Sequence, residues 1–218
     1  SSQGALTQAI EYFFKSLKIQ EKIKDDNGMG ISLINLGELY EQQNDHDKAL
    51  DYYQRALDKF NKVGNKYGSA GCLNNIGNFY FNRKNYDSAI RYHEKALSLR
   101  EEIGDKISIA NSLANIGNLY KRIASYSLAE KYINQSLDIR KAIKERSGIA
   151  SSLTSLGRLH FEQKHYRSAL NYGQKSIKIA QEIGKLKEIL TVSKLLWQVN
   201  KKLNRSAEAL KMYELYVQ

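Results

Sequence analysis

Asparagine side chains recur at a fixed spacing along the chain, each directly before a Leu-Gly or Ile-Gly pair. Asn35, Asn75 and Asn115 stand 40 residues apart, and Ser155 takes this place in the next copy. A carboxamide carries both a hydrogen-bond donor and an acceptor, so it can bind the N–H and C=O groups of another backbone without reading side chains. The pattern therefore points to recognition of an extended peptide.

More polar side chains, many of them asparagines, fall on the same expected helical faces. Because each asparagine costs a helix roughly 0.5 kcal/mol relative to alanine, their accumulation there indicates that the amides have a function. Residues 66–85 and 106–125 contain no Asp or Glu, which predicts an electropositive surface, whereas Glu38 and Glu41 make the first repeat acidic. Arginine binds carboxylates strongly, so we expect an acidic peptide or a free C-terminal carboxylate as the ligand. The candidate peptide-binding residues are Asn35, Asn74, Asn75, Asn78, Asn82, Asn111, Asn115, Asn118, Arg122 and Arg158.

Other interpretations of the same residues stay open at this point. The amides could bridge neighbouring helices or face water, and the basic side chains could form an ordinary solvated surface. Phe81 and Phe161 could either line a ligand groove or pack against other helices, and burial is the commoner fate of aromatic residues at helical spacing. A different class of function is also compatible with the repeats, namely an architectural or dimerisation element without any groove ligand.

The elements that must carry these side chains follow from the repeat itself. Glycine recurs at 37, 77, 117 and 157, and alanine follows twelve residues later at 49, 89, 129 and 169. A period of 40 residues with apolar positions at helical spacing predicts a solenoid of antiparallel helix pairs. A column of tyrosines should belong to its stacked core: Tyr12, Tyr52, Tyr92, Tyr132 and Tyr172.

The ends of the expected helices carry capping signals. Asp45, Asn85 and Ser125 occupy the N-cap position of three second helices, whereas His165 breaks the pattern in the fourth. Left-handed residues are expected at the helix C-termini, where the chain has Gly64, Gly104 and Gly184, with Lys144 as the exception. Glycine inside a helix is costly, so the recurrent glycines at 77 and 117 should mark a close approach of the paired helices.

The combination of Gly, Tyr three residues later, Ala twelve later and Ala or Ser nineteen later resembles the tetratricopeptide repeat. The 40-residue spacing is similar to that of bacterial peptide-responsive regulators, Pins-type scaffolds and sensor regions of bacterial histidine kinases. The resemblance implies an all-α, right-handed superhelix, and in peptide-binding relatives the asparagine before the Gly pair contacts the ligand backbone. We expect one array over 1–218, with a second helix of a truncated repeat at 5–24, full repeats at 28–64, 68–104, 108–144 and 148–184, and a degenerate hairpin at 188–218, where Trp197 replaces the glycine.

Composition narrows the function further. The net charge is +11, but the basic residues are spread over both faces and do not form one stripe, so nucleic acid is not the expected partner. No run is apolar enough for a membrane span or a signal peptide, and the lone Cys72 cannot form an internal disulfide, which favours a cytoplasmic location. His46, His93, His160 and His165 lack companions at metal-ligand spacing, so we predict no metal, cofactor or catalysis. Because 1–24 match half a repeat, we expect a segment of a larger signalling protein that binds a protein or peptide, with homodimerisation as a possibility.

Overall fold

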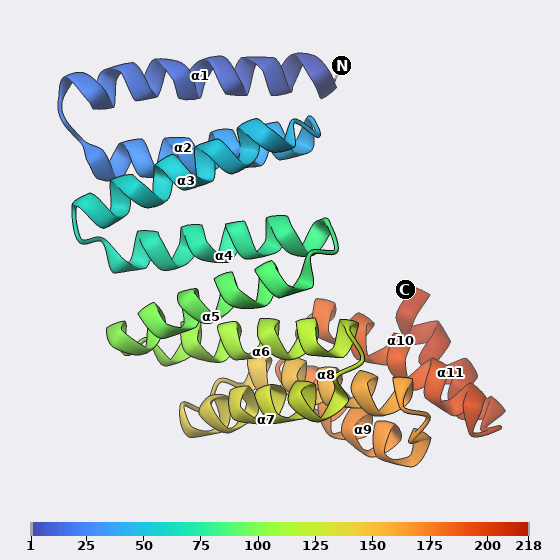
Figure 1. The fold of residues 1–218 in the computed structure, drawn as a ribbon. Coiled ribbons are helices and arrows are strands. Elements are labelled where there is room, and N and C mark those ends of the chain that lie inside the picture. Colours follow the sequence, from blue (N-terminus) through green and yellow to red (C-terminus); the bar gives the residue numbers. More distant parts are fainter. Residues whose placement is uncertain (1, 218) are drawn as a thin grey trace. The chain divides into compact units, whose positions relative to one another are not determined.

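The computed structural model describes residues 2–217, which form eleven α-helices joined by short turns (Figure 1). Consecutive helices pair as antiparallel hairpins, as the 40-residue period predicts. The chain divides into two compact units, the first ending at Asp105 and the second beginning at Lys106, and each is described by itself below.

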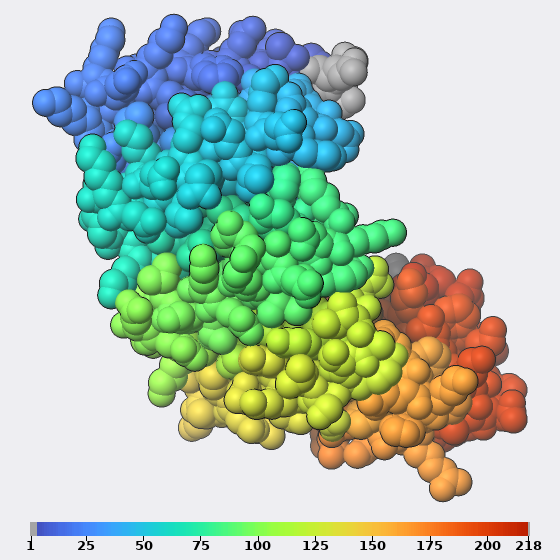
Figure 2. Space-filling view, in the orientation of Figure 1, coloured from blue at the N-terminus to red at the C-terminus, as the bar shows by residue number. Residues whose placement is uncertain are grey.

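The first unit contains α1 (Ser2–Lys22), α2 (Asp26–Gln42), α3 (His46–Lys62), α4 (Lys66–Asn82) and α5 (Tyr86–Ile103). α2 pairs with α3 and α4 with α5, while α1 packs on α2 and α3 packs on α4. In the space-filling view the side chains of α1 to α5 follow one another as adjoining layers in chain order (Figure 2). The core between them is built on fully buried Leu36, Tyr53, Phe60 and Ile76, and it includes the buried thiol of Cys72.

The second unit contains α6 (Lys106–Arg122), α7 (Tyr126–Ala142), α8 (Arg146–Glu162), α9 (Tyr166–Glu182), α10 (Leu186–Lys202) and α11 (Ser206–Val217). Its hairpins are α6/α7, α8/α9 and α10/α11. Ile133 and Leu156 anchor one core cluster, and Leu195 and Val199 anchor another. Trp197 packs against Tyr213 and Tyr216 of α11, with ring centroids 5.3 and 6.5 Å apart.

Ring stacking joins the two helices of each full hairpin. The tyrosine three residues after the repeat glycine lies flat against the tyrosine of the following helix, and in the fourth copy histidine replaces the first ring without loss of the contact. The centroids are 5.2–5.4 Å apart and the planes differ by only 6–13° in Tyr40–Tyr52, Tyr80–Tyr92, Tyr120–Tyr132 and His160–Tyr172. Four of the five tyrosines expected in the core thus pack between the helices of their hairpins, although their ring partners were not predicted.

Tyr12 is the exception, and its expected place in the core is wrong. Its side chain is 71% exposed. Among residues 2–217 no aromatic ring stacks on it, because no described helix occupies the position relative to α1 that α2 occupies relative to α3.

The helix N-termini follow the sequence prediction in part. Asp45 and Asn85 accept the expected capping bonds from the backbone N–H groups of Lys48 and Ser88, at 3.3 and 3.2 Å. The expected cap by Ser125 is wrong: its hydroxyl makes no capping bond. Its ψ is 66°, below the 78–85° of the capping residues, and the short hydroxyl does not reach the helix N–H groups from there. Three caps were not predicted: Asp25, Asn65 and Glu145.

The left-handed turns at the helix C-termini are confirmed. Gly64, Gly104 and Gly184 have φ of +68°, +80° and +64°, and Lys144 adopts +57° in the equivalent turn without the advantage of glycine. The turns inside the hairpins use left-handed residues as well, which the sequence analysis did not anticipate: Asn44, Lys84, Ala124, Lys164 and Asn204.

The repeat glycines mark the closest contact between paired helices. A Cβ on Gly77 would lie 2.8 Å from Nε2 of His93, and one on Gly117 would lie 2.6 Å from Cγ1 of Ile133 and 3.2 Å from the backbone oxygen of Ala129. Real Cβ atoms do not approach so closely, so a side chain here would push the helices apart. The close packing predicted from the sequence is therefore present.

Two glycine substitutions test this constraint against helix propensity. We expect Gly117→Ala to lower the free energy of unfolding by about 1–3 kcal/mol, because the added methyl group meets Ile133 and the α7 backbone. Gly71 in α4 has no atom within 4 Å of its Cβ position, so Gly71→Ala should instead raise stability by up to about 1 kcal/mol. Urea unfolding followed by circular dichroism measures both, and equal signs would contradict the packing argument.

His93 is a titratable group buried at this contact. It is 2% exposed, and its Nδ1 has no hydrogen-bond partner among the described residues. Burial lowers the pKa of His93 to about 4, and the charge of Arg100 adds to the effect. The ring is thus held in its neutral form at neutral pH.

The depressed pKa predicts acid sensitivity. Between pH 6.5 and about 4 the unfolded chain binds a proton at His93 that the folded chain does not, so stability is full above this window and falls by about 3 kcal/mol across it. His93→Gln should remove that part of the pH dependence. The exposed His165→Gln serves as the control, and urea unfolding at several pH values gives the comparison. Identical pH profiles for the two variants would refute the assignment.

Candidate functional site

The first helices of the hairpins lie beside one another within each unit. α2 packs beside α4 in the first unit, and α8 packs beside α6 and α10 in the second. The first unit therefore carries the candidate residues of α2 and α4, which are Asn35, Asn74, Asn75, Asn78 and Asn82. The second unit carries those of α6 and α8, which are Asn111, Asn115, Asn118, Arg122 and Arg158.

Two amides of α4 bridge to the neighbouring first helix. Asn75 Nδ2 donates to Glu38 Oε1 at 3.2 Å, and Asn82 Nδ2 donates to Glu41 Oε1 at 3.1 Å. These bonds show that part of each amide bridges neighbouring first helices, as one of the alternative interpretations of the sequence predicted. A carboxamide has two N–H donors and a carbonyl acceptor, so both side chains retain hydrogen-bonding capacity toward a ligand.

Other candidate amides differ in their surroundings. Asn35 Nδ2 donates to the backbone oxygen of Ile31 one turn earlier in its own helix, at 3.0 Å. Asn74 and Asn115 also interact within the molecule. Asn78 is exposed and Asn118 half-buried, and neither makes a hydrogen bond within residues 2–217. Asn78 and Asn118 are thus the amides with the largest unused capacity.

Asn111 has a structural contact that the sequence analysis did not anticipate. Its Oδ1 accepts a 2.5 Å hydrogen bond from the guanidinium of Arg140 in α7. Arg140 is buried and also donates to Glu145 at 2.7 Å and to Ser136 at 3.1 Å. Since Asn111 satisfies a buried cation, part of its amide serves the fold.

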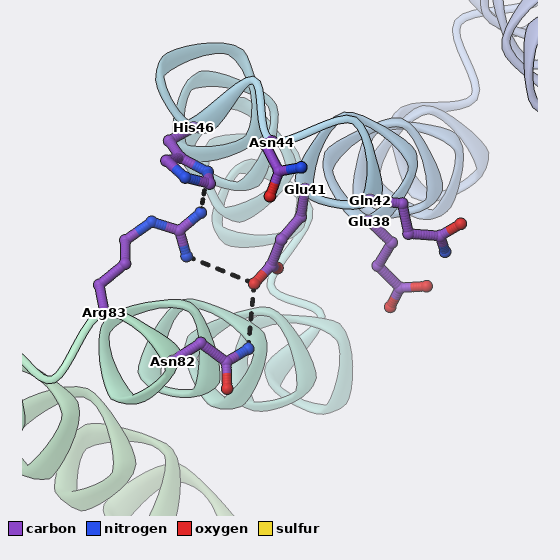
Figure 3. A pocket seen from close by; sticks show the side chains of 7 residues that line it. All are labelled: Glu38, Glu41, Gln42, Asn44, His46, Asn82 and Arg83. Carbon is purple, nitrogen blue, oxygen red and sulfur yellow. Dashed lines mark hydrogen bonds and ion pairs between the residues drawn. The ribbon is translucent and has the colours of Figure 1, made fainter.

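A polar hollow of about 620 Å³ lies in the first unit beside the α2/α3 turn and the end of α4 (Figure 3). Arg83 bridges its walls: its guanidinium meets the His46 ring and donates to Glu41 at 3.4 Å and to the Phe79 backbone oxygen at 2.9 Å. The guanidinium also lies 3.6 Å from the centroid of the Phe79 ring, within cation–π distance. The positive charge of Arg83 offsets the acidity predicted for this repeat.

Glu41 connects this hollow to the core. Besides Asn82 and Arg83, its carboxylate accepts a 3.1 Å hydrogen bond from the hydroxyl of Tyr53, which is 1% exposed. Burial and the neighbouring charge of Glu41 raise the pKa of Tyr53 far above its usual range. The hydroxyl therefore stays protonated and acts as a donor.

A second hollow, of about 260 Å³, lies in the second unit between α8 and α10 and contains Arg158. Arg158 is half-buried and forms no ion pair with any residue in 2–217. The hydroxyl groups of Ser151, Ser155 and Thr191 line the same space. Glu188 also borders it and accepts a 2.7 Å bond from Ser147. The Thr191 hydroxyl already donates to the backbone oxygen of Lys187 at 2.7 Å. The arrangement suits a ligand carboxylate, because it offers the Arg158 cation together with the hydroxyl donors of Ser151 and Ser155.

Four lining residues of this hollow were missed from the sequence: Thr154 of α8, and Lys187, Glu188 and Thr191 of α10. Lys187 and Thr191 follow Ser147 and Ser151 by the 40-residue period. The sequence analysis placed the last copy in register, with Trp197 at the glycine position, but did not extend the candidate face to it.

The two phenylalanines considered as groove residues pack inside their hairpins. The Phe81 ring lies 5.9 Å from Tyr86, and the Phe161 ring lies 5.5 Å from Tyr166. Phe161 also packs on the core of the second unit. Packing inside the protein, the commoner of the two outcomes considered for these residues, is therefore the one observed.

The described part of the chain contains no group of three or more His, Cys, Asp or Glu residues placed to hold a metal ion. Within the same residues, no helix combines the length and the hydrophobicity needed to cross a bilayer.

The paired helices, their repeated glycine contact and the ring stacks define an all-α helical-hairpin repeat protein. The model of the tetratricopeptide repeat matches residues 1–62, 69–142 and 125–182, so the chain belongs to the tetratricopeptide repeat family. This fold is in general a non-catalytic scaffold for protein interaction. Among curated proteins no match was found.

Solved structures share the fold over most of the chain. BtubC (BKLC) from P. vanneervenii superposes with a TM-score of 0.84 at 19% identity, covering 96% of this chain and 89% of that one. The apo form of RapI gives 0.73 at 18% identity, covering 97% and 89%. The Rap conjugation gene regulator of plasmid pLS20, solved in complex with the Phr* peptide, gives 0.66 at 16% identity, covering 86% and 52%. At these sequence identities, the structural similarity shows the fold alone.

The contacts of Glu41 lead to a stability prediction. Glu41→Ala should lower the free energy of unfolding by about 1–2 kcal/mol, because it removes the acceptor of the Tyr53 hydroxyl and of two surface donors. Glu38→Ala removes an exposed carboxylate with one such bond and should change stability by less than about 0.5 kcal/mol. Urea denaturation of both variants measures the difference, and equal losses would mean that Glu41 has no special structural role.

Proposed function

We propose that the chain is a protein-interaction module that binds an extended, acidic peptide segment of a partner along the exposed faces of its first helices. The candidate amides would bind the backbone of the ligand, and the arginines would bind its carboxylates. By resemblance, we further propose that the chain is the sensor or scaffold part of a signalling protein, and that ligand binding alters the packing of its hairpins.

The observation that carries this proposal is the environment of Arg158. A half-buried guanidinium loses part of its hydration, and Arg158 forms no ion pair with any described residue, although Glu188 borders the same hollow. The hydroxyl groups around it leave room of about 260 Å³, enough for a terminal carboxylate or an acidic side chain. A ligand carboxylate would complete the site with charge-assisted hydrogen bonds.

Unused amides on the first helices support backbone recognition, and one of them, Asn118, belongs to the unit that carries the carboxylate site. Asn118 lies on α6 at the position equivalent to Arg158 on α8, 40 residues earlier, and Asn78 is the equivalent position on α4. An extended peptide exposes unpaired N–H and C=O groups along its length, and each carboxamide can serve one of each. Every such bond is worth about 0.5–1.5 kcal/mol net, so several are needed for useful affinity.

The test is a peptide array of acidic sequences with free or amidated C-termini, followed by titration of the best binder. Arg158→Ala should weaken that binder by about 10–100-fold, because a charge-assisted bond contributes about 1.5–3 kcal/mol. Asn78→Ala/Asn118→Ala should weaken it by a smaller factor. Binding should also weaken as salt is raised, because ions screen the charge pairs.

Arg167→Ala is the matched control, since Arg167 is an exposed arginine of α9 outside the proposed face. It should bind like the unmodified protein. If Arg158→Ala and Arg167→Ala bind the array equally, the carboxylate site is wrong. If the asparagine pair has no effect on any binder, backbone recognition by amides is wrong.

A further inference from the structure

A third hollow lies on a different side of the second unit, between α7 and α9, with α8 as its floor. Its volume is about 590 Å³. Leu137, Leu153, Ile149, Tyr172 and Ile179 supply an apolar floor, which is the uncovered edge of a core cluster. Leu137 and Leu153 are buried, while the other three are half-buried and reachable from outside. We call this feature the α7–α9 groove.

Lysines surround this apolar floor. Lys175 and Lys178 are exposed side chains of α9, and neither forms an ion pair with any residue of the described chain. Lys141 of α7 has only an exposed partner, Asp138, at 3.3 Å. A single carboxylate borders the groove, that of Glu182, and it is already paired with Arg146 outside the lining. The rim is therefore positively charged.

The architecture of the repeat explains the floor but does not explain the rim. The apolar positions recur 40 residues earlier, where Leu97, Leu113 and Ile139 correspond to Leu137, Leu153 and Ile179. The lysine positions do not: Glu101 corresponds to Lys141 and Asp138 to Lys178. Hairpin packing tolerates the opposite charge at two of these positions, and Gln135, Lys95 and Arg55 correspond to Lys175 in earlier copies, so the repeat itself does not require three lysines together.

The groove is separate from the face proposed to bind an extended peptide. Ile149 and Leu153 line it from α8, whereas Ser151 and Ser155 line the hollow around Arg158. Two residues along an α-helix correspond to a rotation of about 200°, so these pairs project from opposite sides of α8. A ligand in one hollow leaves the other accessible.

We propose that the α7–α9 groove is a docking site for an acidic amphipathic helix of a partner protein. A helix laid between α7 and α9 would bury an apolar stripe on the floor and place flanking Asp or Glu residues beside the lysines. The hydrogen bonds of a helical backbone are made internally, so it needs none of the amide groups that an extended peptide requires. The lining offers a single amide side chain, that of Asn134, which favours a helix over an extended strand.

Two other anionic partners fit the groove less well. A bilayer presents a flat surface, and the apolar floor is recessed below the lysines between two helices. Nucleic acid would engage the lysines but would leave the apolar floor uncovered. The experiment that follows distinguishes binding of a bilayer or of nucleic acid from binding of a protein helix.

The experiment uses a fluorescent, side-chain-stapled helix of roughly 18 residues with leucine on one face and glutamate on both flanks. Fluorescence anisotropy should give saturable binding to the protein at low salt, and binding should weaken as salt rises. Lys175→Glu/Lys178→Glu should weaken it about tenfold or more, because two attractions become repulsions. Lys202→Glu/Lys211→Glu changes two exposed lysines elsewhere in the unit by the same charge and should have little effect.

Charge exchange makes the test sharper. The same stapled helix with lysine in place of glutamate should bind Lys175→Glu/Lys178→Glu better than it binds the unmodified protein. If Lys202→Glu/Lys211→Glu weakens binding as much as Lys175→Glu/Lys178→Glu does, only the net charge of the protein matters, and the proposal is overturned. Phosphatidylserine vesicles or a DNA duplex binding through Lys175 and Lys178, while the acidic helix does not bind, would overturn it in favour of that partner. The Arg158→Ala protein should bind the acidic helix normally, so failure here and failure of the extended-peptide proposal are distinguishable.

Discussion

The close approach of the two helices in each hairpin is the constraint on which the rest of the structure depends. A Cβ at Gly77 or Gly117 would lie within 3 Å of a side chain of the facing helix, so the hairpin geometry needs glycine there. The same approach brings Tyr80 flat against Tyr92 with an interplanar angle of only 12°. Since both contacts use one face of the first helix, the opposite face is left without a structural task inside its own hairpin.

That free face is where the copies of the repeat diverge. The position three residues before the stacked ring is glycine in all four copies, whereas the position after the glycine is Glu38, Asn78, Asn118 and Arg158 in successive copies. Core packing would tolerate the same residue at all four. The change from acidic through neutral to basic at equivalent positions is therefore not required by the hairpin, and it is consistent with the proposed recognition of a polar ligand.

The sequence predicted the hairpins well because a strict period fixes backbone geometry. The glycine, alanine and tyrosine spacings fix which faces of the two helices meet, whereas the ring stacks, including that of His160, are seen only in the structure. The errors concern features that the period does not encode. Tyr12 has the right spacing but no facing helix among the described residues. Ser125 occupies the N-cap position, but its ψ differs from that of the capping residues and its hydroxyl makes no capping bond.

The candidate site residues were harder to predict, for a related reason. The bonds of Asn75 and Asn82 to Glu38 and Glu41 depend on rotamers and on the distance between neighbouring hairpins, which no spacing gives. The period places Lys187 40 residues after Ser147, but only the structure shows that it lines a hollow with Arg158. The lysines of the α7–α9 groove looked like an ordinary solvated surface, because in the sequence Lys141 is separated from Lys175 by more than 30 residues. The stacking of α7 and α9 over α8 brings these scattered charges together into one rim. The hydrophobic surface beneath the rim distinguishes the proposed docking site from an ordinary solvated surface.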